Sequence, residues 1–239
     1  MKNILLSLLL LTAAFTGRAQ QTLVVDANAS VRNVSGDFKA IRISGGIDLY
    51  LSQSSEVAVA VSASEEKFKD GIKTEVENGT LKIYYEWDKN MSWKNKKLKA
   101  YVSFKTLEKL NASGACDVVV TGAIESASLD MQLSGASDFK GQVKVGTLKL
   151  DLSGASDVHI SGSAGNVDIE SSGASDVKGF DLVTDYCNAK ASGASDINIT
   201  VNKELNANAS GASDIYFKGE GLIKDLHTSG ASSVSRKRG

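Results

Sequence analysis

Apolar and polar residues alternate along the second half of the chain, and the alternating runs return at a nearly constant spacing. Leu129–Leu133 has an apolar residue at every second position, and Leu148–Leu152 repeats that pattern nineteen residues later. A period of two is typical of a β-strand with one buried face. Later runs keep the period but carry smaller apolar residues, such as Ala207 and Ala209. The pattern therefore predicts a series of half-buried strands.

A pentapeptide follows each of these runs. The sequence Ser-Gly-Ala-Ser-Asp occurs five times, preceded by a copy with Cys116 at the fourth position and followed by a copy that ends in Ser233. A shorter apolar run, such as Val118 and Val120, comes after each copy. Each unit is therefore predicted to be a strand, a corner and a second strand. The glycines of the copies stand 18 to 21 residues apart, at positions 114, 135, 154, 173, 193, 211 and 230.

Repetition at this spacing predicts the fold. A two-stranded unit cannot bury its own apolar face, whereas stacked units bury a continuous core and pair their backbones. Helical repeats are longer, and leucine-rich repeats show an Asn ladder that this chain lacks. We therefore predict an all-β, right-handed parallel β-helix, or β-solenoid, with coils of ~19 residues. The corner residues should form columns that rise by ~4.8 Å per coil.

The chain divides into three predicted parts: residues 1–19, residues 20–110 and the solenoid at residues 111–239. The middle part is β-rich and is expected to be an elaboration that caps the solenoid and continues into it. Ile41–Leu51 matches a strand, a corner and an Asp, so it is expected to be a divergent coil. Ser64–Asp70 has a helix-like composition, and Asn78-Gly79 predicts a hairpin turn.

The first nineteen residues have the three parts of a secretory signal peptide. Lys2 precedes the apolar run Ile4–Leu11, and small residues follow up to Ala19. The apolar run is too short to span a bilayer, which takes ~20 residues. We therefore predict an exported chain with no transmembrane segment once the leader is cleaved. Its location would be the periplasm, the outer-membrane surface or the extracellular space.

The two cysteines are not expected to form a disulfide. Cys116 is in the first corner, and Cys187 is on an inward column three coils later. Coil spacing alone separates them by ~14 Å, whereas a disulfide needs Cα atoms within about 7 Å. The formal net charge of −1 gives no reason to expect a nucleic acid partner. The absence of proline suits long backbone ladders.

The motif aspartates should form one column, and two interpretations of it remain open. Stacked carboxylates repel one another unless something compensates their charge. Calcium would do so, although calcium-binding repeats use a shorter, nine-residue Gly-rich unit. In the favoured interpretation no cofactor is needed, and each carboxylate accepts a backbone N–H at its own corner. The column consists of Asp117, Asp138, Asp157, Asp176, Asp196 and Asp214.

The sequence offers no catalytic residues by motif. His159 and His227 lie between inward positions and should face solvent without convergent partners. A carbohydrate-active enzyme on a β-helix scaffold is the alternative, because it would place carboxylates and a basic group on one sheet. The outward residues that could form such a site are Lys149, Asp151, Asp168, Glu170 and Lys190.

The repeated Ser-Gly-Ala-Ser-Asp units, together with Ile-Ser-Gly-Gly-Ile-Asp in the leading part, resemble a known family. They are similar to the auto-transporter adhesin head domain, or GIN domain, a DUF2807-type family of secreted bacterial proteins that is common in Bacteroidetes. The resemblance covers roughly residues 34–234. It implies a right-handed β-helix in a periplasmic or cell-surface setting, a role in adhesion and no catalytic residues.

These observations predict an exported, non-enzymatic adhesin, recognition or structural module. Its partner would be a surface glycan or a surface protein. The candidate binding residues are aromatic residues near a polar loop, with packing onto the cap as the alternative role. A calcium-stabilised structural spacer is a further alternative, and the sequence leaves the oligomeric state open. The candidate aromatic residues are Tyr84, Tyr85, Trp87 and Trp93.

Overall fold

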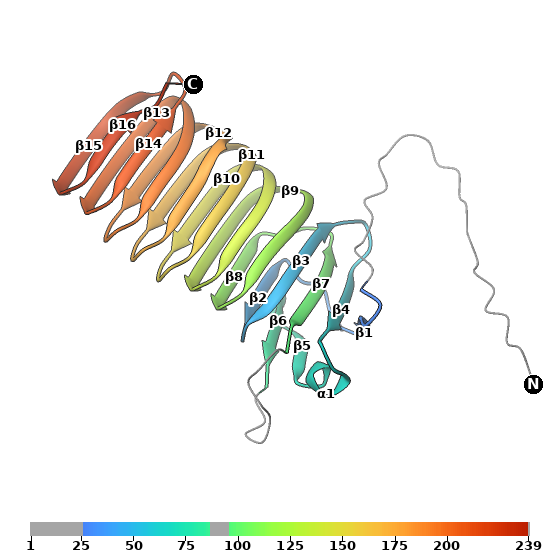
Figure 1. Ribbon diagram of the computed structural model, residues 1–239. Helices are drawn as coiled ribbons and strands as arrows, with labels where there is room; N and C mark the ends of the chain where they lie inside the picture. The colour runs from blue at the N-terminus through green and yellow to red at the C-terminus, as the bar shows by residue number, and fades with distance from the viewer. Residues whose placement is uncertain (1–25, 87–95, 239) are drawn as a thin grey trace, which may run out of the picture.

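The chain folds into a stack of flattened coils with a capped N-terminal end (Figure 1). The computed structural model describes residues 26–86 and 96–238. Strands make up 71% of it and helix 2%, in a β-solenoid of about seven turns with coils about 19 residues apart. The predicted solenoid is therefore confirmed. The predicted signal peptide, residues 1–19, lies outside the described residues.

The elements fall into a cap and a run of solenoid strands. The cap contains β1 (Ser30–Arg32), β2 (Ala40–Ser44), β3 (Ile47–Gln53), β4 (Ala58–Ser62), α1 (Glu66–Lys69), β5 (Ile72–Glu77), β6 (Thr80–Tyr85) and β7 (Leu98–Phe104). The solenoid contains β8 (Lys109–Gly114), β9 (Asp117–Gly135), β10 (Asp138–Leu152), β11 (Asp157–Ser171), β12 (Asp176–Ala191), β13 (Asp196–Gly211), β14 (Asp214–Lys218), β15 (Leu222–Gly230) and β16 (Ser233–Arg236).

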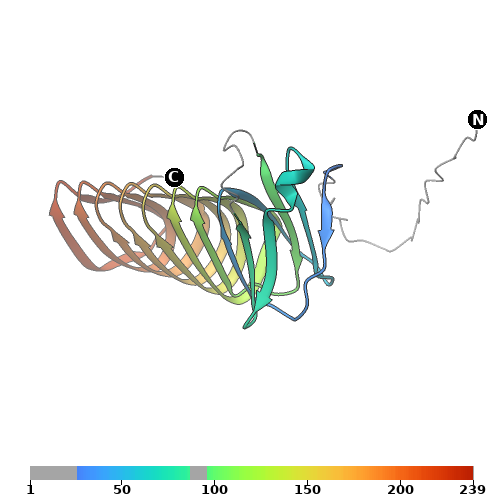
Figure 2. The ribbon, with the colours of Figure 1, turned by 90° about the horizontal axis from the view of Figure 1, so that it is seen from below.

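The strands form two layers around one core (Figure 2). The long strands of the solenoid bend, so that each contributes its first part to one layer and its last part to the other. One layer runs β5, β6, β2 and β8, continues through the last parts of β9 to β13, and ends at β15. The other runs β1, β4, β7 and β3, continues through the first parts of β9 to β13, and ends at β14 and β16.

The apolar columns predicted from the spacing exist in the structure. Leu148 pairs in parallel register with Leu129 on one side and with Val167 on the other. The same column continues through Cys187 and Leu205, and all five side chains are buried. The smaller apolar residues near the C-terminus face a layer with larger ones, such as Phe217. The core therefore stays filled, as close packing requires.

Each corner is held by its glycine and by its second serine. The corner glycines have positive φ, as at Gly154 (82°), and the amide of Ala155 donates to the carbonyl oxygen of Gly135 one coil earlier at 2.7 Å. The second serine is fully buried in each of these corners, and Ser156 Oγ donates to the Ser153 carbonyl at 3.2 Å. Cys116 takes that place in the first corner, where its Sγ lies 3.3 Å from the Ser113 carbonyl oxygen.

The cap is built from coils that are out of chain order. Strands β2 and β3 form the predicted divergent coil, and they pair in parallel with β8 and β9. Strands β6 and β7 follow later in the sequence, yet they lie on the other side of β2 and β3 as a further coil layer. Antiparallel strands then end the stack, β5 in one layer and β4 followed by β1 in the other. The hairpin between β5 and β6 turns at Asn78-Gly79, both with positive φ, as predicted.

Both cysteines are buried and free, as expected from their separation. Burial raises the pKa of the Cys187 thiol to about 12, so this thiol stays protonated and unreactive at neutral pH. In the part of the chain that the structure describes, there is no helix long and apolar enough to cross a bilayer.

Candidate functional site

An unbroken row of polar side chains follows the outer side of the β2–β15 layer. Each member pairs in register with the next, from coil to coil, because residues at the same place in successive coils stack. The row spans the cap and the solenoid, although its first members come from cap strands. We call it the polar row: Lys82, Arg42, Asn111, Gln132, Asp151, Glu170, Lys190, Asn208 and His227.

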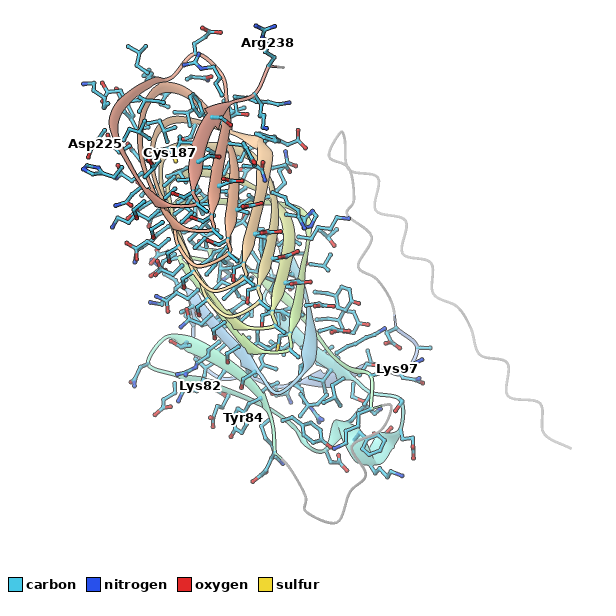
Figure 3. All side chains as sticks on the ribbon, turned by 60° about the vertical axis from the view of Figure 1, so that its left-hand side comes forward. Lys82, Tyr84, Lys97, Cys187, Asp225 and Arg238 are labelled. Atoms are coloured by element: carbon cyan, nitrogen blue, oxygen red, sulfur yellow. The ribbon has the colours of Figure 1, made fainter. Side chains whose placement is uncertain are left out.

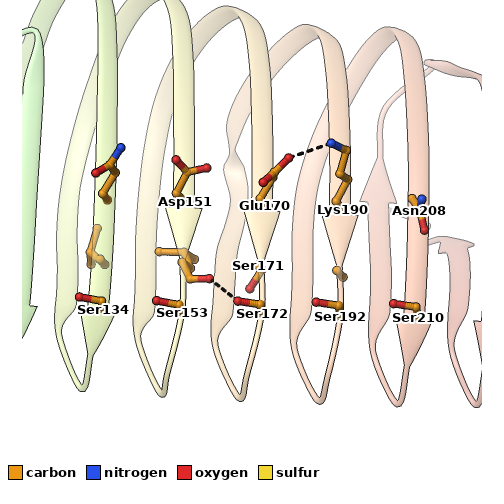
Figure 4. A pocket seen from close by; sticks show the side chains of 14 residues that line it. Ser134, Asp151, Ser153, Glu170, Ser171, Ser172, Lys190, Ser192, Asn208 and Ser210 are labelled. Carbon is orange, nitrogen blue, oxygen red and sulfur yellow. Dashed lines mark hydrogen bonds and ion pairs between the residues drawn. The ribbon is translucent and has the colours of Figure 1, made fainter.

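A shallow groove of about 690 Å³ lies between the polar row and the corners (Figure 4). Its second wall is the first serine of each corner, because that serine faces outward while the second serine is buried. Figure 4 shows these hydroxyl groups in a straight line below Asp151, Glu170 and Lys190. We call this line the serine row: Ser134, Ser153, Ser172, Ser192 and Ser210. The groove therefore presents hydroxyl, amide, carboxylate and ammonium groups at the period of the coils.

Two ion pairs set the charges in the groove. Lys190 Nζ lies 2.8 Å from Glu170 Oε1, and Lys149 Nζ lies 2.9 Å from Asp151 Oδ2. The hydrogen bond from Lys190 lowers the pKa of Glu170, and the bond to Asp151 raises the pKa of Lys149. These ion-paired side chains can bind a ligand through charge-assisted hydrogen bonds.

Two carboxylate oxygens beside these ion pairs have no donor among the described residues. Asp151 Oδ1 and Asp130 Oδ1 are both shielded from solvent and unpaired, while the second oxygen of each is bound by a lysine. An unmet acceptor of this kind costs free energy, roughly 1–3 kcal/mol. Only Asp151 of the two lines the groove, and its Oδ1 is shielded, so a ligand would meet the exposed hydroxyl, amide and charged groups instead.

The residues of the enzyme alternative are brought together here. Lys149 pairs in register with Asp168, and Asp151 pairs with Glu170, which is next to Lys190. A glycosidase needs one carboxyl group with a raised pKa as a general acid beside an ionised one. In this pair the pKa of Glu170 is lowered by Lys190. The geometry thus supplies paired carboxylates, and Glu170 has the electrostatics of a binding group rather than of an acid.

The four aromatic residues predicted to bind a partner have different positions. Tyr84 is half-buried and lies two residues after Lys82, on the same side of β6 and at the cap end of the groove face (Figure 3). Tyr85 is 5% exposed and packs in the core, with Lys96 Nζ 4.3 Å above its ring. It therefore has the packing role, and its ring is not available at the surface. Trp87 and Trp93 lie outside the described residues.

The aspartate column lies on the other layer, at the start of each coil. Carboxylates of Asp138, Asp176 and Asp196 accept backbone N–H groups, as expected, but from the next coil rather than from their own corner. Asp138 Oδ1 accepts the amide of Asp157 at 3.1 Å, and Asp196 Oδ1 accepts that of Asp214 at 3.1 Å. Lys178 also pairs with Asp157 at 2.8 Å. The column is thus part of the ladder that joins the coils.

The pKa values of two adjacent members of this column are shifted in opposite directions. Burial, with the charges of Asp176 and Asp214, raises the pKa of Asp196. Hydrogen bonds from Ser233 and Tyr216 lower the pKa of Asp214. Among residues 26–86 and 96–238, no group of three His, Cys, Asp or Glu side chains converges as a metal site would require. The calcium interpretation of the column stays a prediction.

Both histidines are exposed, in agreement with the prediction. His159 lies on the outer side of β11 between Lys140 and Lys178 of the adjoining coils. His227 Nδ1 lies 3.3 Å from Asp225 Oδ1 within the last coil.

The sequence did not reveal the cap half of the polar row. Lys82 and Arg42 are paired in register, although they are 40 positions apart on strands of the cap. The only signal for them in the sequence is a polar residue between two apolar ones, as in Ile41-Arg42-Ile43. This pattern marks an outward position but does not identify the residue beside it on the adjacent strand.

Comparisons with known proteins identify a matching family and solved structures with a similar fold. Residues 37–221 match the family described as "Putative auto-transporter adhesin, head GIN domain". A "putative adhesin" from Bacteroides fragilis has a TM-score of 0.78 at 21% identity, with 87% of this chain and 96% of that chain covered. A "putative lipid binding protein" from Parabacteroides distasonis has a TM-score of 0.65 at 20% identity, with 89% and 98% covered. At these identities the likeness shows the fold alone. A search of curated proteins gave no match.

Proposed function

The chain belongs to the "Putative auto-transporter adhesin, head GIN domain" family, and from that premise we propose that it is an exported, non-catalytic recognition module. The family and the Bacteroides fragilis neighbour are described as putative adhesins rather than as enzymes. A solenoid supports this role because it presents a long, rigid surface on which side chains recur at a fixed period. The site of binding is the groove between the polar row and the serine row.

The observation that carries this proposal is the chemistry of that groove. Five serine hydroxyls at one coil spacing face a row of amide and charged side chains. A ligand rich in hydroxyl groups would satisfy both kinds of partner, since hydroxyls donate and accept. The proposed ligand is therefore an extended glycan on a cell surface.

Other classes of ligand fit this groove less well. An acyl chain needs an apolar lining, whereas this lining is dominated by Ser, Asp, Glu, Lys and Asn side chains. A nucleic acid needs a stripe of unpaired Lys and Arg, whereas Lys190 and Lys149 are each paired with a carboxylate. A surface protein is the remaining partner class, and it is one outcome of the experiment below.

The experiment is a binding screen of the exported protein against an array of neutral and acidic glycans. The matched variants are Glu170→Gln in the groove and Glu125→Gln outside it, because each glutamate pairs with a lysine of the next coil. The proposal predicts retention on at least one glycan, lost in Glu170→Gln and kept in Glu125→Gln. Equal loss in both variants, or retention on immobilised surface proteins alone, would count against a glycan site in the groove.

A second candidate function rests on Asp151 and Glu170, which pair in register in the groove. A carbohydrate-active enzyme would use them as its two carboxylates. Incubation with acidic polysaccharides, followed by measurement of new reducing ends, tests it. Release of reducing ends by the parent chain and not by Asp151→Asn would establish this alternative. The recognition module predicts no release by either chain.

A further inference from the structure

The C-terminal end of the solenoid is an open edge. Strand β15 pairs with β13 on one side, and no strand of the described chain pairs with its other side. Every residue of β15 is exposed, including Leu222 (67%), Ile223 (40%) and Leu226 (49%). The opposite end of the stack is closed by antiparallel cap strands. Figure 1 shows β15 and β16 as the last strands at the uncapped end.

The register with β13 fixes where the side chains of β15 point. Ile223 is opposite Leu205, and Leu226 is opposite Ala207, so both belong to columns that are buried in the earlier coils. Leu226 is exposed only because no further coil covers it. Asp225 and His227 are opposite outward residues and lie on the outer side, as Figure 3 shows for Asp225.

This edge is complementary to itself. We propose that β15 pairs in antiparallel fashion with β15 of a second copy of this chain, about a two-fold axis through Leu226. That register places Leu226 opposite Leu226 of the second copy. It also places Asp225 opposite His227 of the second copy, twice by symmetry. An apolar contact at the axis is thus flanked by two pairs of opposite polarity, a favourable set of cross-strand neighbours.

Neighbouring registers lose this complementarity. An axis through Asp225 would oppose two carboxylates, and an axis through His227 would leave each Asp225 opposite Ser229. Like charges directly opposite one another are destabilising. Of these registers, only the axis through Leu226 pairs the leucines and gives each Asp225 an imidazole partner, so the strand matches a second copy of itself in one register.

The two-layer architecture tolerates this arrangement. The two-fold axis of an antiparallel pair is perpendicular to the sheet, so the core-facing side chains of both copies remain on the same side of it. Leu226 of each copy would then cover Leu226 of the other. The second layer also stays aligned, because β16 of each copy lies on that same side.

The features that protect this end leave residues 225–230 open. Lys224 lies at a bulge in the register and pairs with Glu204 at 3.1 Å, at the start of the strand. Arg236 is turned onto its own coil, where it donates to the carbonyl oxygens of Gly219 and Gly221. Charged residues and bulges are the usual guards of an edge strand. Here they block only the beginning of β15 and the edge of β16.

The expected dimer is weak and depends on concentration. A nine-residue strand is ~30 Å long and the two layers lie ~10 Å apart, so each end face has a cross-section of roughly 300 Å². That is below the ~800 Å² that each partner of a standard interface buries. Cross-linking is therefore a better test than isolation of a stable dimer.

The test is disulfide formation by Leu226→Cys and, as a matched control, by Leu222→Cys. Paired Cα atoms across an antiparallel axis lie ~4.5–5.5 Å apart, within disulfide range. Two copies of residue 222 would be ~26 Å apart in this register. The native cysteines are buried and do not interfere. We expect mild oxidation to link Leu226→Cys at least ten times faster than Leu222→Cys. Equal rates, or no link in either variant, would overturn the proposal.

A second measurement does not depend on cysteine chemistry. Sedimentation velocity over a range of concentrations should show association of the parent chain. The variant Leu226→Lys should remove it, since two ammonium groups would meet at the axis. Val31→Lys, an exposed apolar position at the other end, should keep it. A parent chain that stays monomeric at the highest concentration, or association lost equally in both variants, would contradict the pairing.

Discussion

The carbonyl oxygen of Gly173 lies 2.6 Å from the position that a Cβ on Gly193 would occupy, and it accepts the amide hydrogen of Ala194 at 2.8 Å. Consecutive coils therefore approach one another so closely at the corners that only a residue without a side chain fits. The positive φ of Gly193 (82°) makes the same demand. The repeated glycine is thus required by the stacking of the coils as well as by the turn.

Gly193→Ala should destabilise the fold by roughly 2–4 kcal/mol, because it adds a backbone clash to an unfavourable φ. Gly79→Ala is the matched control, since its φ is also positive (72°) but no atom lies within 4 Å of the added Cβ. The control should lose only about 1 kcal/mol. Urea unfolding followed by circular dichroism measures both. Equal losses of stability in the two variants would show that the positive φ alone accounts for the glycine that recurs in every corner.

The spacing of the repeats was sufficient to predict the solenoid, because one coil repeats the next. Leu129, Leu148 and Val167 stack as the period required. The cap could not be predicted in the same way. The pairing of Ala40 with Thr80 places β6, a later strand, on the outer side of the earlier strand β2. No repeated motif in the sequence marks that contact. Prediction of the polar row stopped at the same point, since Lys82 and Arg42 extend it through cap strands.

Ser195→Ala should cost roughly 1–3 kcal/mol of stability, because it leaves buried backbone groups without partners. Ser195 Oγ accepts the amide of Ser192 at 3.1 Å and donates to the carbonyl of Ser171 at 3.0 Å. Ser195→Cys should cost less, since Cys116 already occupies this place in the first corner. Thermal unfolding of the three chains compares them. The corner account would be wrong if the Cys and Ala variants lost the same stability.

Two aspartates of one column should respond to pH in opposite senses. The pKa of Asp214 is lowered below its ordinary value of 3.8, so its ionised form stabilises the fold above that value, and this contribution is lost as the pH falls through the folded pKa. The pKa of Asp196 is raised, so its protonated form stabilises the fold below 3.8, and this contribution is lost as the pH rises through the folded pKa.

Asp214→Asn should therefore lower the free energy of unfolding at pH 7 and have little effect near pH 3. Asp196→Asn should raise the free energy of unfolding at pH 7, and this increase should become smaller toward pH 3. Urea titrations of the parent and both variants at the two pH values test this. Changes of the same sign in both variants at pH 7 would contradict the assignment.

Calcium should not change the stability of the fold. Several of the aspartate carboxylates already accept backbone N–H groups. Asp157 is paired with Lys178, and Asp214 accepts hydrogen bonds from Tyr216 and Ser233. Calcium at about 100 times its Kd would add ~2.7 kcal/mol, a shift of several degrees in Tm. We expect equal Tm values with excess calcium and with a chelator. A calcium-dependent rise of that size would restore the metal interpretation of the column.

The central claim is that the groove between the polar row and the serine row is the recognition surface, and filling it tests that claim most directly. Ser153→Trp would place a large side chain in the groove, whereas Ser163→Trp changes an exposed serine of the next coil that does not line it. The measurement is the affinity of each variant, with unchanged circular dichroism, for the glycan that the parent chain retains. The account predicts at least a tenfold loss for Ser153→Trp and none for Ser163→Trp. Parent-like affinity in Ser153→Trp would contradict it.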